Sequence, residues 1–224
     1  MNPPSVDLYS PAHKGQRARI FHFAEKAGTM DYSDKTALLT VCEELKTIRD
    51  EFRLHASLEE KFIHPLLSNR VPGGAKKLEQ AHRDMHEQLD DVVLHAENLK
   101  VKDAHFEKQG ELGLEFYRAW NRFIAFYLTH INEEEEQIQP TLRSLCTDQE
   151  LMMTFSTIIA SMSPVELMGV LRMMIPAMNQ NERTGLLSSV KSHAPPQAFQ
   201  NISNLAQEVL SPGDWAELKA RLGI

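Results

Sequence analysis

The feature that most constrains the fold is a series of apolar stripes at helical spacing, which histidine and glutamate residues enter. Phe116, Trp120, Phe123, Tyr127 and His130 follow one another at steps of four, three, four and three residues. Such steps place all five side chains on one face of an α-helix. A histidine therefore stands where a core residue is expected, and the run "HINEEEE" supplies acids one turn later.

Periodicity of about 3.6 residues runs through almost every long segment, and no convincing strand alternation is present. Ser10 followed by Pro11 is typical of a helix start, and "VPGG" at 71–74 is the clearest break in the chain. Pro140 is expected to bend the last long helix, because it lacks a backbone N–H. The sequence thus predicts four long helices, at about 11–30, 33–69, 75–100 and 109–145.

The composition changes after Cys146. Residues 147–224 contain one of the ten histidines and seven of the ten methionines. Serine, asparagine and proline punctuation predicts up to five shorter helices, at about 148–161, 164–178, 182–193, 196–210 and 212–222. The expected fold class is therefore all-α, with an antiparallel up-down four-helix bundle at 1–146 and a smaller helical region at 147–224.

The second predicted helix shows the polar interruption clearly. Its stripe consists of Leu38, Val41, Leu45, Ile48, Phe52, His55, Glu59, Phe62 and Leu66. Only His55 and Glu59 are polar, and their i,i+4 spacing makes them neighbours on the helix surface.

Each of the other three predicted helices also places histidine in or beside its stripe, and the last one adds a glutamate. These residues are His13, His82, His86, His130 and Glu134, with Ile138 expected to continue the last stripe. The polar pairs of the second and third helices lie about 8–14 residues from the "VPGG" break. At 1.5 Å per residue they fall at one height of an antiparallel hairpin, although His13 fits that layer less tightly.

These seven polar groups need partners if they are buried, because an isolated buried charge costs several kcal/mol. For any single histidine, a hydrogen-bonded core position is the simpler interpretation, whereas a shared metal centre satisfies the whole set. Imidazole with carboxylate suits iron, zinc or manganese, and the absence of cysteine ligands argues against a structural zinc site. The candidate metal ligands are His13, His55, Glu59, His82, His86, His130 and Glu134.

In this pattern the sequence resembles the hemerythrin-like, or His-His-Glu cation-binding, family. That family has one histidine on the first helix, HxxxE on the second, HxxxH on the third and HxxxE or HxxxxD on the fourth. The matching stretches are "PAHKGQR", "HASLE", "HRDMH" and "HINEE", and the resemblance covers residues 10–145. The ending "HINEEEEQIQP" resembles the iron-sensing hemerythrin domain of a eukaryotic F-box ubiquitin-ligase subunit, although nothing in the chain resembles an F-box.

The resemblance implies two iron ions in an oxo- or hydroxo-bridged, non-haem di-iron centre. His13 and His55 would bind one iron, and His82, His86 and His130 the other. Glu59 and Glu134 would bridge the two ions, with Glu133 or Glu135 as alternatives to Glu134. Two octahedral irons offer about twelve positions, of which about eleven are filled. The vacancy, on the iron with two histidines, would accept dioxygen, nitric oxide or peroxide.

Three functions are consistent with such a centre. The first is a sensing or storage protein that binds dioxygen, nitric oxide or iron itself, with a possible protein partner for residues 147–224. The second is a di-iron enzyme: a peroxidase, an oxidase or a nitric-oxide-linked repair protein. The third is a metal-stabilised scaffold. A ferritin-like site is disfavoured because it needs two ExxH motifs, and only Glu79–His82 is present.

Other features of the sequence bear on the binding partners and the location of the protein. The net charge of −7 gives no support for nucleic-acid binding. The sequence contains no apolar stretch of about 18 residues, so no membrane span is predicted. The opening "MNPPSVDLYSP" lacks the basic and apolar regions of a secretory signal. Cys42 and Cys146 are too few for a disulfide scaffold, so a reduced, cytoplasmic location is expected.

Several histidines are set aside as ligands. His22, His64 and His95 lie off the apolar stripes and are expected at the surface. His105 falls in the connection between the third and fourth long helices, and His193 lies outside the bundle.

Other residues near the candidate ligands are also set aside. Glu60 is expected to point about 100° around the helix from Glu59. Trp120 and Tyr127 are interpreted as core packing near the centre. Seven methionines are interpreted as the core of a small helical subdomain, with an adaptable partner surface as the alternative. They are Met152, Met153, Met162, Met168, Met173, Met174 and Met178.

Overall fold

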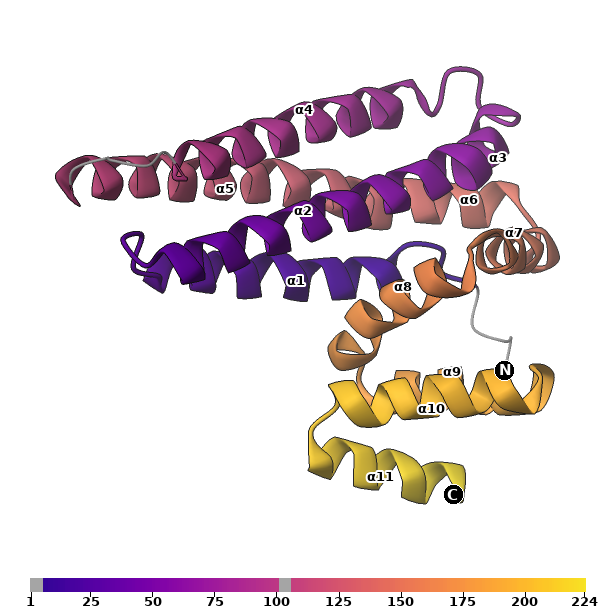
Figure 1. The fold of residues 1–224 in the computed structure, drawn as a ribbon. Coiled ribbons are helices and arrows are strands. Elements are labelled where there is room, and N and C mark those ends of the chain that lie inside the picture. The colour runs from indigo at the N-terminus through magenta and orange to yellow at the C-terminus, as the bar shows by residue number, and fades with distance from the viewer. Residues whose placement is uncertain (1–5, 101–105) are drawn as a thin grey trace. The chain divides into compact units, whose positions relative to one another are not determined.

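The structure is a computed structural model that describes residues 6–100 and 106–224, and within these ranges it contains helices and no strand (Figure 1). This confirms the all-α fold class. No single described helix is long and apolar enough to cross a membrane; the helices Asp148–Ser161 and Pro164–Ala177 meet that test only as a pair across the break between them. The elements are α1 (Ser10–Thr29), α2 (Lys35–Leu58), η1 (Glu59–Ile63), α3 (His64–Ser68), α4 (Lys76–Asn98), α5 (Phe106–Glu133), η2 (Glu134–Ile138), α6 (Gln139–Leu145), α7 (Asp148–Ser161), α8 (Pro164–Ala177), α9 (Gln180–His193), α10 (Pro196–Val209) and α11 (Pro212–Leu222).

The chain forms two compact units. One comprises the described residues up to Leu8 together with Arg19–Ile158, and the other comprises Tyr9–Ala18 together with Ile159–Ile224. The two halves of α1 therefore belong to different units. A domain boundary between residues 146 and 147 stays a prediction.

The first unit is built on the four-helix bundle. The helices α1, α2, α4 and α5 run in alternating directions, with α2 continued by η1 and α3, and α5 continued by η2 and α6 (Figure 1). Its core combines Ile20, Phe23 and Ala27 of α1 with apolar side chains of the other three helices. The largest buried side chains of this core are Phe23, Phe52, Phe116, Trp120, Phe123 and Tyr127.

The connection between α1 and α2 is held by local contacts. Asp34 caps α2, because its side chain accepts hydrogen bonds from the backbone N–H groups of Thr36 and Ala37. The Tyr32 hydroxyl donates to the Ala27 carbonyl oxygen at 2.6 Å. The Tyr32 ring lies so close to Gly113 of α5 that a Cβ there would stand 2.4 Å from the ring.

Two π-helical segments interrupt the long helices, and each shifts the buried stripe by one residue. From the end of η1 onward, Ile63 and Leu67 are buried, whereas Phe62 and Leu66, predicted as core, are only partly buried. A π-turn contains about one residue more than an α-turn, so the residues beyond it rotate to another face. The predicted α-helical register was therefore wrong beyond Glu59.

The same shift follows η2. Ile138, predicted to continue the stripe, is partly buried, while Gln139 and Leu142 are buried instead. Pro140 stands two residues after η2, as Pro65 stands two residues after η1. Proline lacks an N–H and crowds the preceding turn, which favours a departure from α-helical bonding. Pro140 was expected to bend this helix, and the structure shows a π-helical segment just before it.

The second unit contains α8 to α11 and the first half of α1. Its buried core consists of Leu171, Ile175, Leu187, Ile202, Leu205, Ala206, Leu210, Leu218 and Leu222. Ser163 and Asn179 form capping boxes at the starts of α8 and α9. The five short helices expected after Cys146 are thus all present, as α7 to α11.

Candidate metal centre

Four buried side chains form a compact group of possible metal ligands in the bundle. They are Glu59, His82, His130 and Glu134, and each offers a ligand atom within 4.8 Å of the others. His82 Nε2 lies 3.3 Å from a Glu59 oxygen and 3.8 Å from a Glu134 oxygen. His130 Nε2 lies 3.4 Å from Glu134. Segments distant in sequence therefore direct two imidazoles and two carboxylates to one point.

Burial makes this group chemically unusual. Glu59 is 2% exposed, and Glu134 and His82 are completely buried. Two carboxylates removed from water require compensating positive charge. Burial alone would lower the pKa of His82, but the carboxylates of Glu134 and Glu59 outweigh it and raise that pKa to about 10. The group thus attracts a cation, and a metal ion can take the place of the His82 proton.

His55 extends the group on one side. Its Nε2 lies 3.0 Å from Oε1 of Glu59, whereas Oε2 of the same carboxylate faces His82. His13 is completely buried on α1 and lies beside the Tyr9 ring, with ring centroids 5.6 Å apart. It belongs to the second unit, so its place in the same metal centre stays a prediction.

His86 is not part of the group of four. It is half-buried one turn after His82, and its Nε2 has no hydrogen-bond partner. Burial, followed by the nearby Arg53 and His82, lowers the pKa of His86 and favours the neutral imidazole that a metal requires. Its role as a ligand stays a prediction.

The geometry distinguishes the three glutamates considered as bridges. Glu134 is fully buried against His82 and His130. Glu133 instead accepts a hydrogen bond from Lys77 Nζ at 2.6 Å, and Glu135 is partly buried. Of these three glutamates, Glu134 belongs to the buried group of possible metal ligands.

Two residues that the sequence analysis set aside lie against the centre. His64, expected at the surface, is 2% exposed and stacks on His82 with ring centroids 5.1 Å apart. That expectation was wrong because η1 rotates His64 inward, and Pro65 was the available signal of the irregularity. Glu60, expected to point away, places Oε1 2.9 Å from His82 Nδ1.

Of the other histidines that were set aside as ligands, three are described by the structure. His22 and His193 are exposed, and His95 is half-buried next to Asp91 at 3.7 Å. His105 lies outside the described residues. Among the candidate core aromatics, Trp120 and Tyr127 are both fully buried.

The methionines of residues 147–224 differ in burial, and Met162, Met173 and Met174 are partly buried. Met178 is buried and Met168 packs against the second core, as expected of a small helical subdomain. Met152 and Met153 are instead 51% and 62% exposed on α7.

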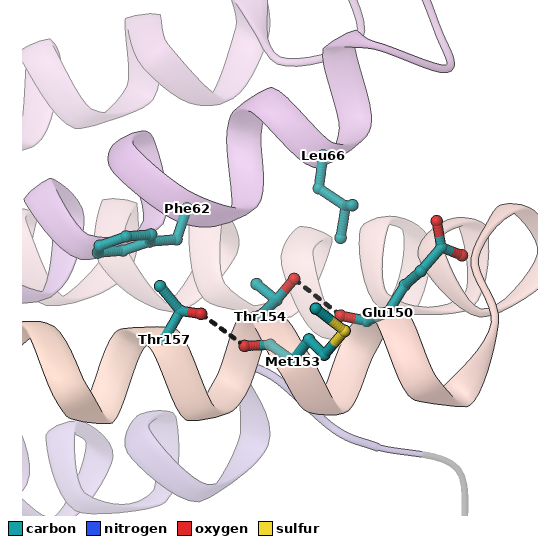
Figure 2. Close-up of a pocket in the computed structure, with 6 residues that line it drawn as sticks. All are labelled: Phe62, Leu66, Glu150, Met153, Thr154 and Thr157. Atoms are coloured by element: carbon teal, nitrogen blue, oxygen red, sulfur yellow. Dashed lines mark hydrogen bonds between the residues drawn. The ribbon is translucent and has the colours of Figure 1, made fainter.

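A separate pocket lies where η1 and α3 face α7 (Figure 2). It has a volume of about 290 Å³ and is lined by Phe62, Leu66, Glu150, Met153, Thr154 and Thr157. Both threonine hydroxyls donate to carbonyl oxygens of α7, at 3.0 and 2.8 Å, so little hydrogen-bonding capacity faces the pocket. The π-turn at η1 directs Phe62 and Leu66 to this surface. None of the lining residues is a candidate metal ligand.

A four-helix bundle with a buried cluster of histidines and glutamates defines a cation-binding helical protein. The hemerythrin HHE cation-binding domain matches residues 5–142, more than half of the chain. The chain therefore belongs to the hemerythrin HHE cation-binding family.

The chain is also similar to F-box/LRR-repeat protein 5 from several animals. It is 27% identical to the protein of Xenopus laevis over 150 residues, which cover 66% of this chain and 21% of the relative. The protein of Mus musculus is 25% identical over 153 residues, and that of Danio rerio 24% over 149 residues, with the same two coverages. The match thus spans about a fifth of the length of these relatives.

Proposed function

We propose that the bundle holds a non-haem di-iron centre that binds dioxygen, nitric oxide or iron itself in a sensing or storage role. The observation that carries the proposal is the orientation of Glu59. Its Oε1 lies 3.0 Å from His55 Nε2, and its Oε2 lies 3.3 Å from His82 Nε2. One buried carboxylate therefore faces histidines of two different helices, which is the arrangement expected of a ligand shared between two metal ions.

In this proposal the family pattern assigns each side chain a role. His13 and His55 hold one iron, and His82, His86 and His130 hold the other. Glu59 and Glu134 bridge the pair. When bound, such a pair supplies a redox-capable centre with one open position for a small ligand. Iron fits the donors, because imidazoles and carboxylates without thiolates are typical of non-haem iron sites.

Iron reconstitution tests the proposal directly. The chain is incubated with Fe²⁺ without oxygen, freed of excess metal, and analysed for iron content and optical spectrum before and after exposure to air. We expect about two irons per chain and a visible absorption change on oxygenation. A chain that retains no transition metal contradicts the di-iron centre. A chain that retains iron but shows no response to air, azide or nitric oxide supports a scaffold role instead.

An enzyme is the second candidate, and the partial exposure of the centre favours it. The His55 side chain is 15% exposed and His86 is half-buried, so small oxidants can approach this edge of the group from water. Sustained peroxide turnover that disappears in Glu134→Ala supports a peroxidase, an oxidase or a nitric-oxide-linked repair enzyme. Reversible oxygenation without turnover supports the binding role.

A sensing role also requires a region that responds to the bound ligand. We propose that the protein is cytoplasmic. We also propose that residues 147–224 are this region and that they contact a protein partner. In support, α7 exposes Met152, Met153 and Phe155. A sensor must bind its ligand with different affinity in two conformations. Limited proteolysis of the full chain with and without iron tests this, and identical cleavage patterns contradict it.

A further inference from the structure

The side chain of Glu60 contacts the edge of the His82 ring that is turned away from the buried carboxylates. Glu60 Oε1 lies 2.9 Å from His82 Nδ1, while His82 Nε2 faces Glu59 at 3.3 Å. We propose that Glu60 is a positioning residue for the metal centre: it accepts the Nδ1 proton of His82 and so holds Nε2 toward the metal. This inference rests on the proposed metal-binding function and adds a residue outside the ligand set.

The location of Glu60 explains how it reaches His82. It is the second residue of η1, directly after Glu59, and both glutamates of this segment contact the same imidazole. In a regular α-helix the two side chains would diverge by about 100°. The wider π-turn and the length of the glutamate side chain allow one carboxylate to approach each ring nitrogen.

The hydrogen bond has a defined chemical consequence. Neutral imidazole carries its proton on either Nδ1 or Nε2, and only the nitrogen without the proton can bind a metal. A carboxylate that accepts from Nδ1–H selects the tautomer with a free Nε2, fixes the ring orientation and makes Nε2 more basic. His82 is completely buried and the Glu60 side chain is 43% exposed, so the acceptor stands at the outer edge of the centre.

The experiment compares full-length chains with Glu60→Ala, Glu60→Gln and the control Glu136→Ala. Glu136 is an exposed glutamate of η2, and its loss removes one negative charge from the other π-helical segment. Affinity is measured with Co²⁺ in competition with a chelator, which avoids oxygen chemistry. Removal of a carboxylate behind a metal-bound histidine typically lowers metal affinity by about 10–100-fold. We expect that loss in Glu60→Ala, substantial recovery in Glu60→Gln and wild-type affinity in Glu136→Ala.

A second readout separates positioning from general destabilisation. In the Zn²⁺-loaded protein, the His82 Nδ1 proton is expected to exchange slowly with water and to be visible by ¹⁵N-edited NMR. Glu60→Ala should lose this signal while it keeps the helical circular dichroism spectrum. Wild-type affinity in Glu60→Ala, no recovery in Glu60→Gln or an equal loss in Glu136→Ala would each overturn the assignment. Failure of the wild-type chain to bind Co²⁺ would overturn the metal centre itself as well.

Discussion

Glu59 and Glu134 occupy equivalent positions in two different helices: each is the first residue of a π-helical segment, and each lies next to His82 Nε2, at 3.3 and 3.8 Å. The equivalence extends further along the chain. A buried polar residue follows each segment, His64 or Gln139, and a proline comes directly after it. The backbone N–H of that polar residue donates to the carbonyl oxygen of the glutamate five residues earlier. The two ligand candidates are therefore presented by the same local structure.

Deletion of Lys61 tests whether the π-turn matters for metal binding. Lys61 is exposed within η1, and its removal leaves the number of residues that an α-helical turn requires. We expect Ile63 and Leu67 to stay in the core, so the helical circular dichroism should be kept. Without the wider turn, Glu60 should no longer reach His82 Nδ1, so Co²⁺ affinity should fall by about tenfold. Lys61→Ala keeps the backbone and should bind as the wild type does; equal affinity in the deletion variant contradicts the prediction.

Substitution of the neighbouring glutamates tests which carboxylate serves the centre. Glu134→Gln removes a charge that is fully buried beside two histidines, and we expect the metal content to fall by one or both ions. Glu133→Gln removes only a carboxylate that pairs with Lys77 and should leave the metal content unchanged. Elemental analysis after gel filtration measures both variants. A larger loss in Glu133→Gln would exclude Glu134 as the bridge.

Removal of His13 tests the binding of the second metal ion. We expect His13→Ala to retain about one metal ion where the wild type holds two, because the proposal gives one ion only His13 and His55 as imidazole ligands. His22 stands on the same helix with its side chain exposed, so His22→Ala is the matched control. The stoichiometry is measured by titration with Co²⁺. Two ions bound to His13→Ala would place His13 outside the centre.

Metal affinity should rise with pH across the neutral range. The carboxylates around His82 raise its pKa to about 10 in the absence of metal, above the ordinary histidine value of about 6.5. Its proton therefore stabilises the metal-free fold below about pH 6.5, and this contribution is lost as pH approaches 10. A metal must displace the same proton, so affinity for Co²⁺ should increase up to tenfold per pH unit between pH 6 and 8. Affinity should continue to fall in more acidic solution because ligand imidazoles must be neutral, and unchanged metal content after dialysis at about pH 4.5 contradicts the prediction.

The contact between Gly113 and Tyr32 predicts a large difference between two glycines of α5. Gly113→Ala forces a Cβ to within 2.4 Å of the Tyr32 ring and should lower the free energy of unfolding by about 1–3 kcal/mol. Gly110 has open space around it, so Gly110→Ala should raise the free energy of unfolding by up to about 1 kcal/mol. Chemical denaturation of both variants measures the effect. Equal stability of the two would contradict the close approach.

Much of the bundle follows from periodicity alone. The predicted stripe of α2 is buried from Leu38 to Phe52, and the capping residue Asp34 lies within one residue of the predicted helix start at about 33. Helical spacing also placed Glu59, His82, His130 and Glu134 on inward faces, which the structure confirms. These positions were predictable because each lies on a regular helix or is the first residue of a π-helical segment, where the preceding α-helical spacing still applies.

The errors begin where the helical geometry changes. A spacing rule built on 3.6 residues per turn assigned His64 to the surface and Phe62 to the core, and both assignments are wrong because of η1. It also assigned Glu60 away from the centre. A sequence pattern does not show whether a backbone N–H donates to the carbonyl oxygen four or five residues earlier. The prolines at 65 and 140 were the only local signs of the change, and a proline alone is compatible with a kink as well as a π-turn.

Gln139 connects the candidate ligand Glu134 to the start of the described chain through hydrogen bonds. Its amide uses both ends: Oε1 accepts from the Leu8 N–H at 2.9 Å, and Nε2 donates to the Val6 carbonyl oxygen at 2.8 Å. The same residue anchors the end of η2 through its backbone bond to Glu134. A displacement of η2 would therefore be transmitted to residues 6–8, so a movement at Glu134 would reach a segment more than 125 residues away in the sequence.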